Sequence, residues 1–216
     1  MCKITSERYF LCFFNFRQTF ADFFLEGRMK LKRCEWVNLK NPLYVKYHDE
    51  EWGRPLHDDQ KLFELLILET FQAGLSWECV LNKREAFRAA YDRFDVDKVA
   101  AYTEQKQAEL LQNPAIIRNK LKVKASIQNA VIFKSIQKEF GSFDKYIWHF
   151  TDGKVIKEDY RQRTFSPLSD TISKDLKKRG MKFVGTTIIY SFLQSMGVIN
   201  GHGDGCEVEQ TISAIM

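Results

Sequence analysis

Two cysteines and two histidines form two pairs near opposite ends of the sequence. Cys34 and His48 lie near the start with thirteen residues between them, and His202 and Cys206 lie near the end as His-x3-Cys. Two thiolates and two imidazoles make a tetrahedral set that suits zinc. Four protein ligands leave no position for water, so such a site is structural. The spacing alone leaves open that the cysteines are ordinary buried thiols and His48 a hydrogen-bonded core histidine.

Aromatic residues are dense in the segment that follows the first of these cysteines. Between positions 36 and 77 the chain places Trp36, Tyr44, Tyr47, Trp52 and Trp77. Rings at this density can line a pocket for a flat ligand and stack on it, while tyrosine hydroxyls and tryptophan N–H groups remain as donors. The alternative is a hydrophobic core built from large side chains.

Glu69 is a carboxylate in an apolar segment that we expect to be helical over 59–73. It shares a helical face with Leu62, Leu65 and Leu66, where a charge is costly unless it has partners. Such a carboxylate is a functional candidate. Beside a stacked base it could accept hydrogen bonds from an amino group and attract a cationic base. The structural alternative is a hydrogen-bond anchor at a helix end.

Basic residues cluster between two expected helices, around a hairpin that reads RGMKFVGTT over 179–187. They are Lys174, Lys177, Lys178, Arg179 and Lys182. We expect Gly185 to begin a helix whose free N–H groups can bind a phosphate, which would hold a nucleic-acid backbone without reading its sequence. The alternative is a solvated charged face. A second basic run over 118–124 is a weaker candidate for the same role.

The elements that must position these residues are expected to be helices, and the predicted fold class is all-α. Periodicity and capping residues predict helices at about 59–73, 77–92, 104–112, 118–139, 142–150, 169–179 and 185–196. The four prolines fall at the expected element boundaries. Residues 151–167 are polar and expected to form a loop, and no Asn-Gly pair lies between alternating strands.

Composition describes an ordinary globular protein. Its 216 residues are 44% hydrophobic and 28% charged with a net charge of +5, which excludes disordered and fibrous classes and permits a polyanionic partner. Charges interrupt every long apolar stretch, so we expect no membrane helix. Five cysteines and no secretion signal favour a reducing cytoplasm. Residues 1–28, with seven of the eighteen phenylalanines, are expected to be an extension of doubtful origin, with Met29 as a natural start.

Together these motifs resemble the bacterial DNA-3-methyladenine glycosylase I family of the helix-hairpin-helix superfamily. The resemblance runs from about Arg33 to Cys206. It rests on RCEWV at 33–37, PLY at 42–44, YHD at 47–49, EWG at 51–53, FQAGLSW at 71–77, LKKRG at 176–180 and FVGTT at 183–187.

The resemblance implies an architecture and a metal. We expect a two-lobed helix-hairpin-helix glycosylase fold, formed by a single domain over 29–216 with the hairpin near 174–197. One structural Zn²⁺ would tie the ends of the chain through Cys34, His48, His202 and Cys206. The expected protein is a monomer that binds alkylated double-stranded DNA and no membrane.

The resemblance also implies site residues. Glu69 and Tyr47 would be catalytic and contact the flipped base, with Trp77 as stacking platform and Trp36, Tyr44 and Trp52 as the remaining wall. The hairpin over 178–186 would anchor DNA through Lys178, Lys182, Gly185 and Thr186. Gln72 and Leu75 would fill the gap left in the duplex.

The implied reaction is excision of 3-methyladenine by a monofunctional glycosylase that hydrolyses the N-glycosidic bond and leaves an abasic site. The alternative is an alkylation-lesion-binding protein without catalysis. Asn200 keeps this alternative open, because it stands where many members of the superfamily carry a catalytic aspartate. A zinc deaminase is disfavoured, because the chain lacks the His-x-Glu and Cys-x-x-Cys pattern.

Overall fold

The computed structural model describes residues 31–209, and the expected extension over 1–28 lies outside that range. The chain divides into two compact units, Glu35–Asp204 and a smaller one formed by Met1–Cys34 with Gly205–Met216. The prediction of one domain over 29–216 therefore stays a prediction. Within residues 31–209, none of the helices combines the length and apolar character needed to cross a bilayer.

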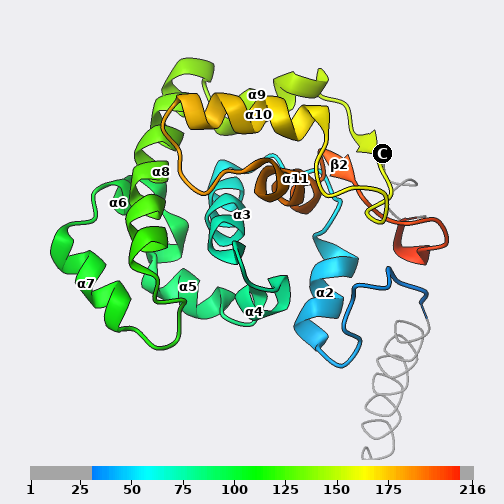
Figure 1. Cartoon of the computed structure of the whole chain (residues 1–216), viewed down its shortest axis with the longest axis horizontal. Helices are drawn as coiled ribbons and strands as arrows, with labels where there is room; N and C mark the ends of the chain where they lie inside the picture. Colours follow the sequence, from blue (N-terminus) through cyan, green and yellow to red (C-terminus); the bar gives the residue numbers. More distant parts are fainter. Residues whose placement is uncertain (1–30, 210–216) are drawn as a thin grey trace, which may run out of the picture. The chain divides into compact units, whose positions relative to one another are not determined.

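The larger unit is mostly helical, as predicted (Figure 1). Its helices are α2 (Pro42–Glu50), α3 (Asp59–Gln72), α4 (Trp77–Leu81), α5 (Arg84–Ala90), α6 (Val96–Ala100), α7 (Glu104–Gln112), α8 (Lys120–Phe140), α9 (Phe143–Trp148), α10 (Pro167–Lys178) and α11 (Thr186–Ser195). Short 3-10 turns cover Asp92–Phe94 and His149–Thr151.

Two short strands were not predicted. β1 (Ile156–Lys157) and β2 (Ile199–Asn200) pair in parallel, with Ile156 opposite Ile199 and Lys157 opposite Asn200. Each strand has two residues, which is too short for the alternating pattern that reveals a strand in sequence. β1 lies within the segment 151–167 that was predicted to be a loop.

The helix predicted over 77–92 is in fact two helices. α4 ends at Leu81, and Lys83 adopts φ −104° and ψ 1°, outside the helical region, before α5 begins. The backbone N–H of Lys83 bonds to the carbonyl of Val80 instead of the residue four positions back. Helix α2 was not predicted, although Asn41 caps it and Pro42 occupies its first turn, both ordinary start signals.

Helix α3 forms the core of the larger unit. Its residues from Leu62 to Phe71 are all buried, and it packs against α4, α8, α9 and α11; Figure 1 shows it enclosed by these elements. A helix that is covered on every side normally carries apolar residues only. Glu64 and Glu69 of α3 are buried because of this central position, so each needs an explanation.

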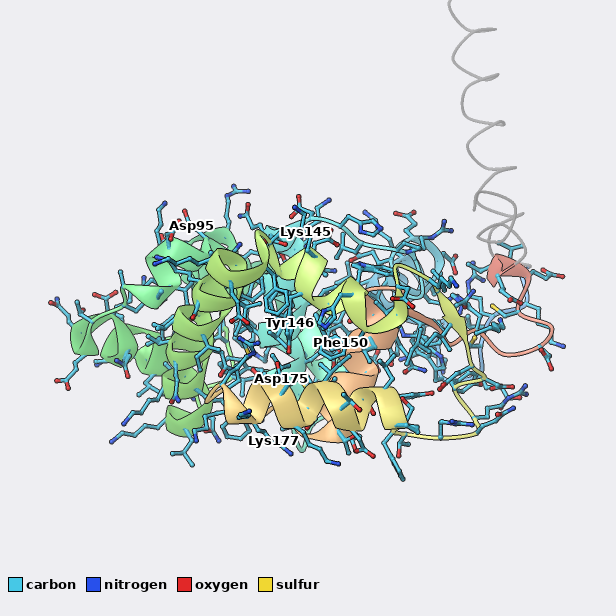
Figure 2. The ribbon with its side chains drawn as sticks, turned by 90° about the horizontal axis from the view of Figure 1, so that it is seen from above. Asp95, Lys145, Tyr146, Phe150, Asp175 and Lys177 are labelled. Atoms are coloured by element: carbon cyan, nitrogen blue, oxygen red, sulfur yellow. The ribbon has the colours of Figure 1, made fainter. Side chains whose placement is uncertain are left out.

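Helix α10 packs against α11, is hydrogen-bonded to α9 and leaves another face to solvent. The Tyr146 hydroxyl of α9 donates to Asp175 Oδ2 of α10 at 2.8 Å, and Arg179 Nε donates to the same oxygen at 2.7 Å. Lys177, two positions from Asp175, is exposed on the opposite side of the helix (Figure 2). The contacts with α9 therefore fix which face of the basic segment remains available to a partner.

Candidate active site

Glu69 is a buried carboxylate on the last turn of α3. Its side chain is 2% exposed, and its Oε2 atom accepts no hydrogen bond from any residue that the structure describes. Burial raises the pKa of this carboxyl group to about 8, because the charged form has lost its water. Glu69 is therefore a buried carboxyl group that keeps its proton more readily than an exposed one, and no described residue bonds to its Oε2 atom.

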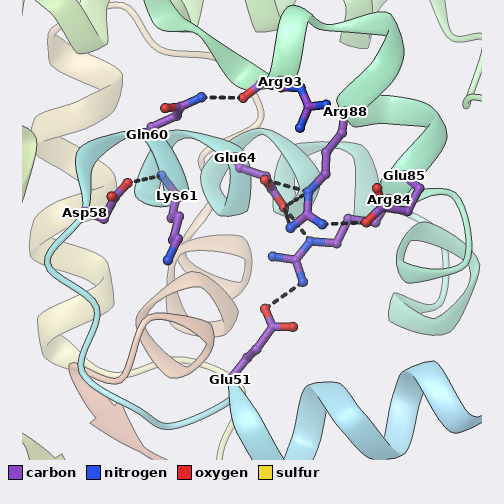
Figure 3. A network of polar contacts seen from close by, with 9 residues as sticks. All are labelled: Glu51, Asp58, Gln60, Lys61, Glu64, Arg84, Glu85, Arg88 and Arg93. Carbon is purple, nitrogen blue, oxygen red and sulfur yellow. Dashed lines mark hydrogen bonds and ion pairs between the residues drawn. The ribbon is translucent and has the colours of Figure 1, made fainter.

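Glu64, on the same helix, shows how a buried carboxylate is stabilised when its role is structural. It accepts hydrogen bonds from Arg84 and from Arg88, whose Nη2 lies 2.8 Å from Glu64 Oε1 (Figure 3). Arg84 Nη1 also donates to Glu51 Oε2 at 2.6 Å. Two guanidinium groups compensate the charge of Glu64. Burial is the cause that raises the pKa of Glu69, so this carboxylate is kept in the core without such compensation.

A pocket of about 220 Å³ lies beside Glu69. Pockets for drug-sized ligands occupy roughly 300–1,000 Å³, so this one suits a single heterocycle. Its lining consists of Trp36, Tyr47, Trp52, Glu69, Gln72, Trp77, Tyr160, Arg163, Thr164, Thr187, Tyr190, Ser191 and Gln194. The structure thus brings together five of the six residues predicted to bind a base. The sixth, Tyr44, is not in the lining and packs against Trp36 at a ring-centroid distance of 5.2 Å.

The aromatic residues of the pocket form two pairs. The rings of Tyr47 and Trp77 lie 5.2 Å apart, and those of Trp36 and Trp52 lie 4.8 Å apart. The Nε1 atoms of Trp36 and Trp77 are buried and donate to no residue in the range 31–209. Gln194 Nε2, which also lines the pocket, is unpaired as well, so the described lining holds flat surfaces, three unpaired donor atoms and one unpaired carboxyl oxygen. This combination fits a planar polar ligand.

The pocket holds its tyrosine in the neutral form. Burial raises the pKa of Tyr47 well above its ordinary value, and the nearby Glu69 carboxylate raises it further. Burial, followed by Glu78 and Glu69, raises the pKa of Tyr44 to about 12. At neutral pH the Tyr47 hydroxyl is therefore a donor rather than a base.

Capping residues set the positions of these side chains. Asn41 caps α2, which carries Tyr47, and Ser76 caps α4, which begins with Trp77. Gly74, at φ +78°, makes the turn between the helix of Glu69 and the helix of Trp77. Most other residues disfavour this backbone conformation, so the local sequence fixes the angle between two walls of the pocket.

The predicted DNA hairpin joins α10 to α11. Lys178 and Lys182 are exposed, and Gly185 caps α11 without a side-chain hydrogen bond, which leaves the first N–H groups of that helix available to an anion. Thr186 Oγ1 lies 2.9 Å from Ser169 Oγ. Arg179 differs from its basic neighbours because it is bound to Glu139 and Asp175.

The predicted metal ligands divide between the two units. In the smaller unit the sulfur atoms of Cys34 and Cys206 lie within 4.8 Å of each other. In the larger unit the rings of His48 and His202 have centroids 5.0 Å apart. All four side chains are buried, and the zinc site that would join them stays a prediction.

Asn200 does not line the pocket. It is buried, and its Oδ1 atom lies 2.9 Å from His202 Nδ1 and accepts from the backbone N–H of His202 at 3.2 Å. Its carboxamide therefore holds a predicted metal ligand rather than facing the aromatic wall.

Several lining residues were missed by the sequence analysis. One wall consists of polar residues from α11 and from the segment before α10: Tyr160, Arg163, Thr164, Thr187, Tyr190, Ser191 and Gln194. A signal for the α11 group does exist in the sequence. Thr187, Ser191 and Gln194 recur at helical spacing in a segment that is otherwise apolar.

The fold and pocket define a helical protein with a small aromatic pocket beside a buried carboxyl group, and with two helices, α10 and α11, joined by a short hairpin of which α11 lines that pocket. A family model described as methyladenine glycosylase matches residues 36–210. The chain belongs to this methyladenine glycosylase family.

Similar proteins of known name and known structure support this family assignment. The chain is 45% identical over 183 residues to DNA-3-methyladenine glycosylase 1 of Escherichia coli (strain K12), covering 82% of this chain and 96% of the relative. It is 42% identical over 178 residues to DNA-3-methyladenine glycosylase of Haemophilus influenzae, covering 81% and 96%. A crystal structure of 3-methyladenine DNA glycosylase I superposes with a TM-score of 0.78 at 46% identity, covering 82% of this chain and 98% of that one.

Proposed function

We propose that this protein is a DNA glycosylase that excises 3-methyladenine from alkylated double-stranded DNA. The family and the names of its relatives support this activity. The observation that carries it is the buried Glu69 carboxyl group among aromatic rings, with no partner at Oε2, because a cationic base would favour its ionised form and pair with it.

The chemistry follows from the substrate. Adenine alkylated at N3 is positively charged while it is attached to the sugar, so its glycosidic bond is already weak. The nucleotide is flipped into the pocket, where Trp77 and Trp36 stack on the base and Glu69 and Tyr47 bind its edge. The C1′–N9 bond breaks with its electron pair going to the base, which leaves as neutral 3-methyladenine. Water adds to C1′ and releases a proton, leaving an abasic site.

The remaining predicted residues would bind the duplex. Lys178 and Lys182 neutralise phosphates, while the N–H groups after Gly185 and the hydroxyl of Thr186 bind one phosphate directly. Leu75 is 41% exposed at the turn beside the pocket, where it and Gln72 fill the space that the flipped nucleotide leaves.

We further propose that Cys34, His48, His202 and Cys206 bind one zinc ion. The donor set fits, because soft thiolates and imidazoles are the ligands that zinc prefers. Both rings are also held as metal ligands usually are: Asp49 Oδ1 lies 2.9 Å from His48 Nδ1, and Asn200 Oδ1 lies 2.9 Å from His202 Nδ1. These bonds would leave the Nε2 atom of each ring to bind the ion. Four protein ligands make the ion structural, and a reducing cytoplasm would keep the thiols available.

The protein is expected to act as a monomer and without a covalent intermediate. No lysine lines the pocket, so the chain offers no amine there to form a Schiff base with the sugar, and excision should leave the DNA strand uncut. Borohydride treatment during turnover should therefore trap no protein–DNA adduct. A trapped adduct would contradict the monofunctional mechanism.

The function itself is tested by chromatography of the bases released from methylated duplex DNA. The wild-type protein should release 3-methyladenine, and Glu69→Gln should lose about 100-fold or more in rate, because a neutral amide cannot compensate the cationic base. Absence of any released base from the wild-type reaction would contradict the proposal and favour the lesion-binding alternative.

A further inference from the structure

The pocket has two chemically different walls. Trp36, Tyr47 and Trp77 with Glu69 form the wall already assigned to the base. The facing wall is polar and comes largely from α11, through Thr187, Tyr190, Ser191 and Gln194. These four positions share one helical face, and the other face of α11 is apolar, with Ile189, Phe192 and Leu193 fully buried. The proposed function leaves this polar wall without a role.

The polar wall runs from solvent into the core. Thr187 is exposed and Ser191 is half-buried, whereas Gln194 is only 8% exposed. Gln194 is seven positions after Thr187, a rise of about 10 Å along the helix. Thr187 is therefore at the exposed end of this wall, where α11 begins, and Gln194 is at its buried end.

The backbone of Gln194 is held by a hydrogen bond, but its side-chain nitrogen lacks a hydrogen-bond partner among the described residues. Its backbone carbonyl accepts from the N–H of Gly53 at 2.9 Å. Its Nε2 atom is buried and donates to no residue within 31–209. A Cβ atom at Gly201 would lie 2.5 Å from this nitrogen and 3.0 Å from the ring of Trp52, so the glycine leaves the space that the carboxamide occupies.

An unpaired buried amide destabilises a protein, and a leucine at this position would not carry that penalty. Native structures satisfy nearly all buried polar groups, so each exception needs an explanation. The pocket supplies an explanation, because a ligand group next to Gln194 would complete its hydrogen bond.

We propose that Gln194 is a further catalytic residue, which holds the attacking water against C1′ of the flipped nucleotide. This inference rests on the proposed function. With the base on the aromatic wall, the deoxyribose would face α11, and the proposal places C1′ within reach of a water held by Gln194. Nε2 donates to the water oxygen, whose remaining lone pair attacks C1′. The electron pair of the C1′–N9 bond leaves with the base, and the water proton passes to solvent, because a neutral amide takes none.

The first test replaces the carboxamide with an apolar group of similar size. Gln194→Leu should lower the rate of base release from methylated DNA under single-turnover conditions by about 10- to 100-fold. Its affinity for free 3-methyladenine, measured by tryptophan fluorescence, should stay within about twofold of wild type, because the aromatic wall is intact. Gln105→Leu, at an exposed position of α7, is the matched control and should behave as wild type.

Thermal stability separates this role from a structural one. Gln194→Leu should unfold at the same temperature as wild type or higher, because it removes an unpaired buried donor. A lower melting temperature together with the lower rate would show a structural role and overturn the inference. A parallel loss of free-base affinity would also overturn it, since the contact would then be to the base.

Gln194→Glu gives a readout that a packing residue would not. As its carboxylate ionises it can accept the water proton and stabilise the cation at C1′, so the rate of this variant should rise with pH relative to wild type. A rate that follows the wild-type pH profile would contradict the inference. If wild type releases base and Gln194→Leu releases it equally fast, this inference alone fails. If wild type releases no base, the proposed function fails with it.

Discussion

The ammonium group of Lys122 donates hydrogen bonds to the carbonyl oxygens of Phe71 and Ala73, at 2.9 Å and 2.6 Å. These carbonyls belong to the C-terminal end of α3, where a cation is favourable. Lys122 lies in the first turn of α8 and thereby fixes the turn between the helix of Glu69 and the helix of Trp77. Lys122 belongs to the basic run over 118–124 that was predicted as a weaker phosphate-binding candidate, but its side chain is buried.

Removing this cation should loosen the turn that carries Gln72 and Leu75. Lys122→Met keeps the length of the side chain but leaves two carbonyl oxygens unpaired, which should lower the free energy of unfolding by about 1–3 kcal/mol. Amide hydrogen exchange should speed up at Gly74 and Leu75, and excision from duplex DNA should fall. Lys124→Met, at an exposed position of the same helix, should leave the free energy of unfolding, the amide exchange and the excision rate unchanged. Equal effects of the two variants would contradict the assignment.

The stability of the protein should depend on pH through Glu69. Its pKa is raised to about 8 in the folded protein, from an ordinary value of 4.5. Between these values the folded state holds a proton that the unfolded state has released, so stability falls as pH rises through this window. Glu69→Gln removes that loss, and its melting temperature should exceed that of wild type at pH 8–9 and approach it at pH 5.

Glu64→Gln is the matched control for this pH dependence. Glu64 is equally buried but bound to Arg84 and Arg88, so its amide variant leaves two cations partly unpaired and should be less stable than wild type at neutral pH. A stability difference between Glu69→Gln and wild type that does not change with pH would contradict the assignment for Glu69.

Salt dependence should distinguish the lysines of the hairpin from the arginine between them. Lys178→Gln or Lys182→Gln should each weaken binding to any duplex and reduce the slope of log affinity against log salt by about 0.9. Arg179→Gln should leave the slope unchanged and lower stability, because Arg179 binds Glu139 at 2.6 Å and Asp175 at 2.7 Å. A smaller slope for Arg179→Gln would show that this residue contacts phosphate.

The zinc proposal is tested by metal content and chelation. One equivalent of zinc should be found in the purified protein, and a chelator should lower the melting temperature. Cys206→Ser should reduce zinc content, whereas Cys79→Ser should not, because Cys79 lies in α4 and is not one of the four proposed ligands. A purified protein that contains no zinc and whose melting temperature does not change when a chelator is added would contradict the proposal.

The sequence predicted the helical class, and it predicted one pocket from Trp36, Tyr47, Trp52, Glu69 and Trp77. The close spacing of these residues and the apolar helix face around Glu69 are local properties of the sequence. It did not predict the polar wall. The positions of Gln194 and Lys122 depend on contacts with Gly53 and Ala73, which lie far away in the chain. Only the folded protein shows that the amide nitrogen of Gln194 has no hydrogen-bond partner among the described residues, whereas the ammonium group of Lys122 binds two backbone carbonyls.

The central claim is that the protein breaks the glycosidic bond rather than only binding the lesion. The most direct measurement follows base release and lesion-DNA affinity in the same samples of wild type and Glu69→Gln. We predict that wild type releases 3-methyladenine and that Glu69→Gln binds lesion DNA but releases base about 100-fold more slowly. Tight lesion binding by both proteins with no base released by either would contradict the claim, and would identify a damage-binding protein.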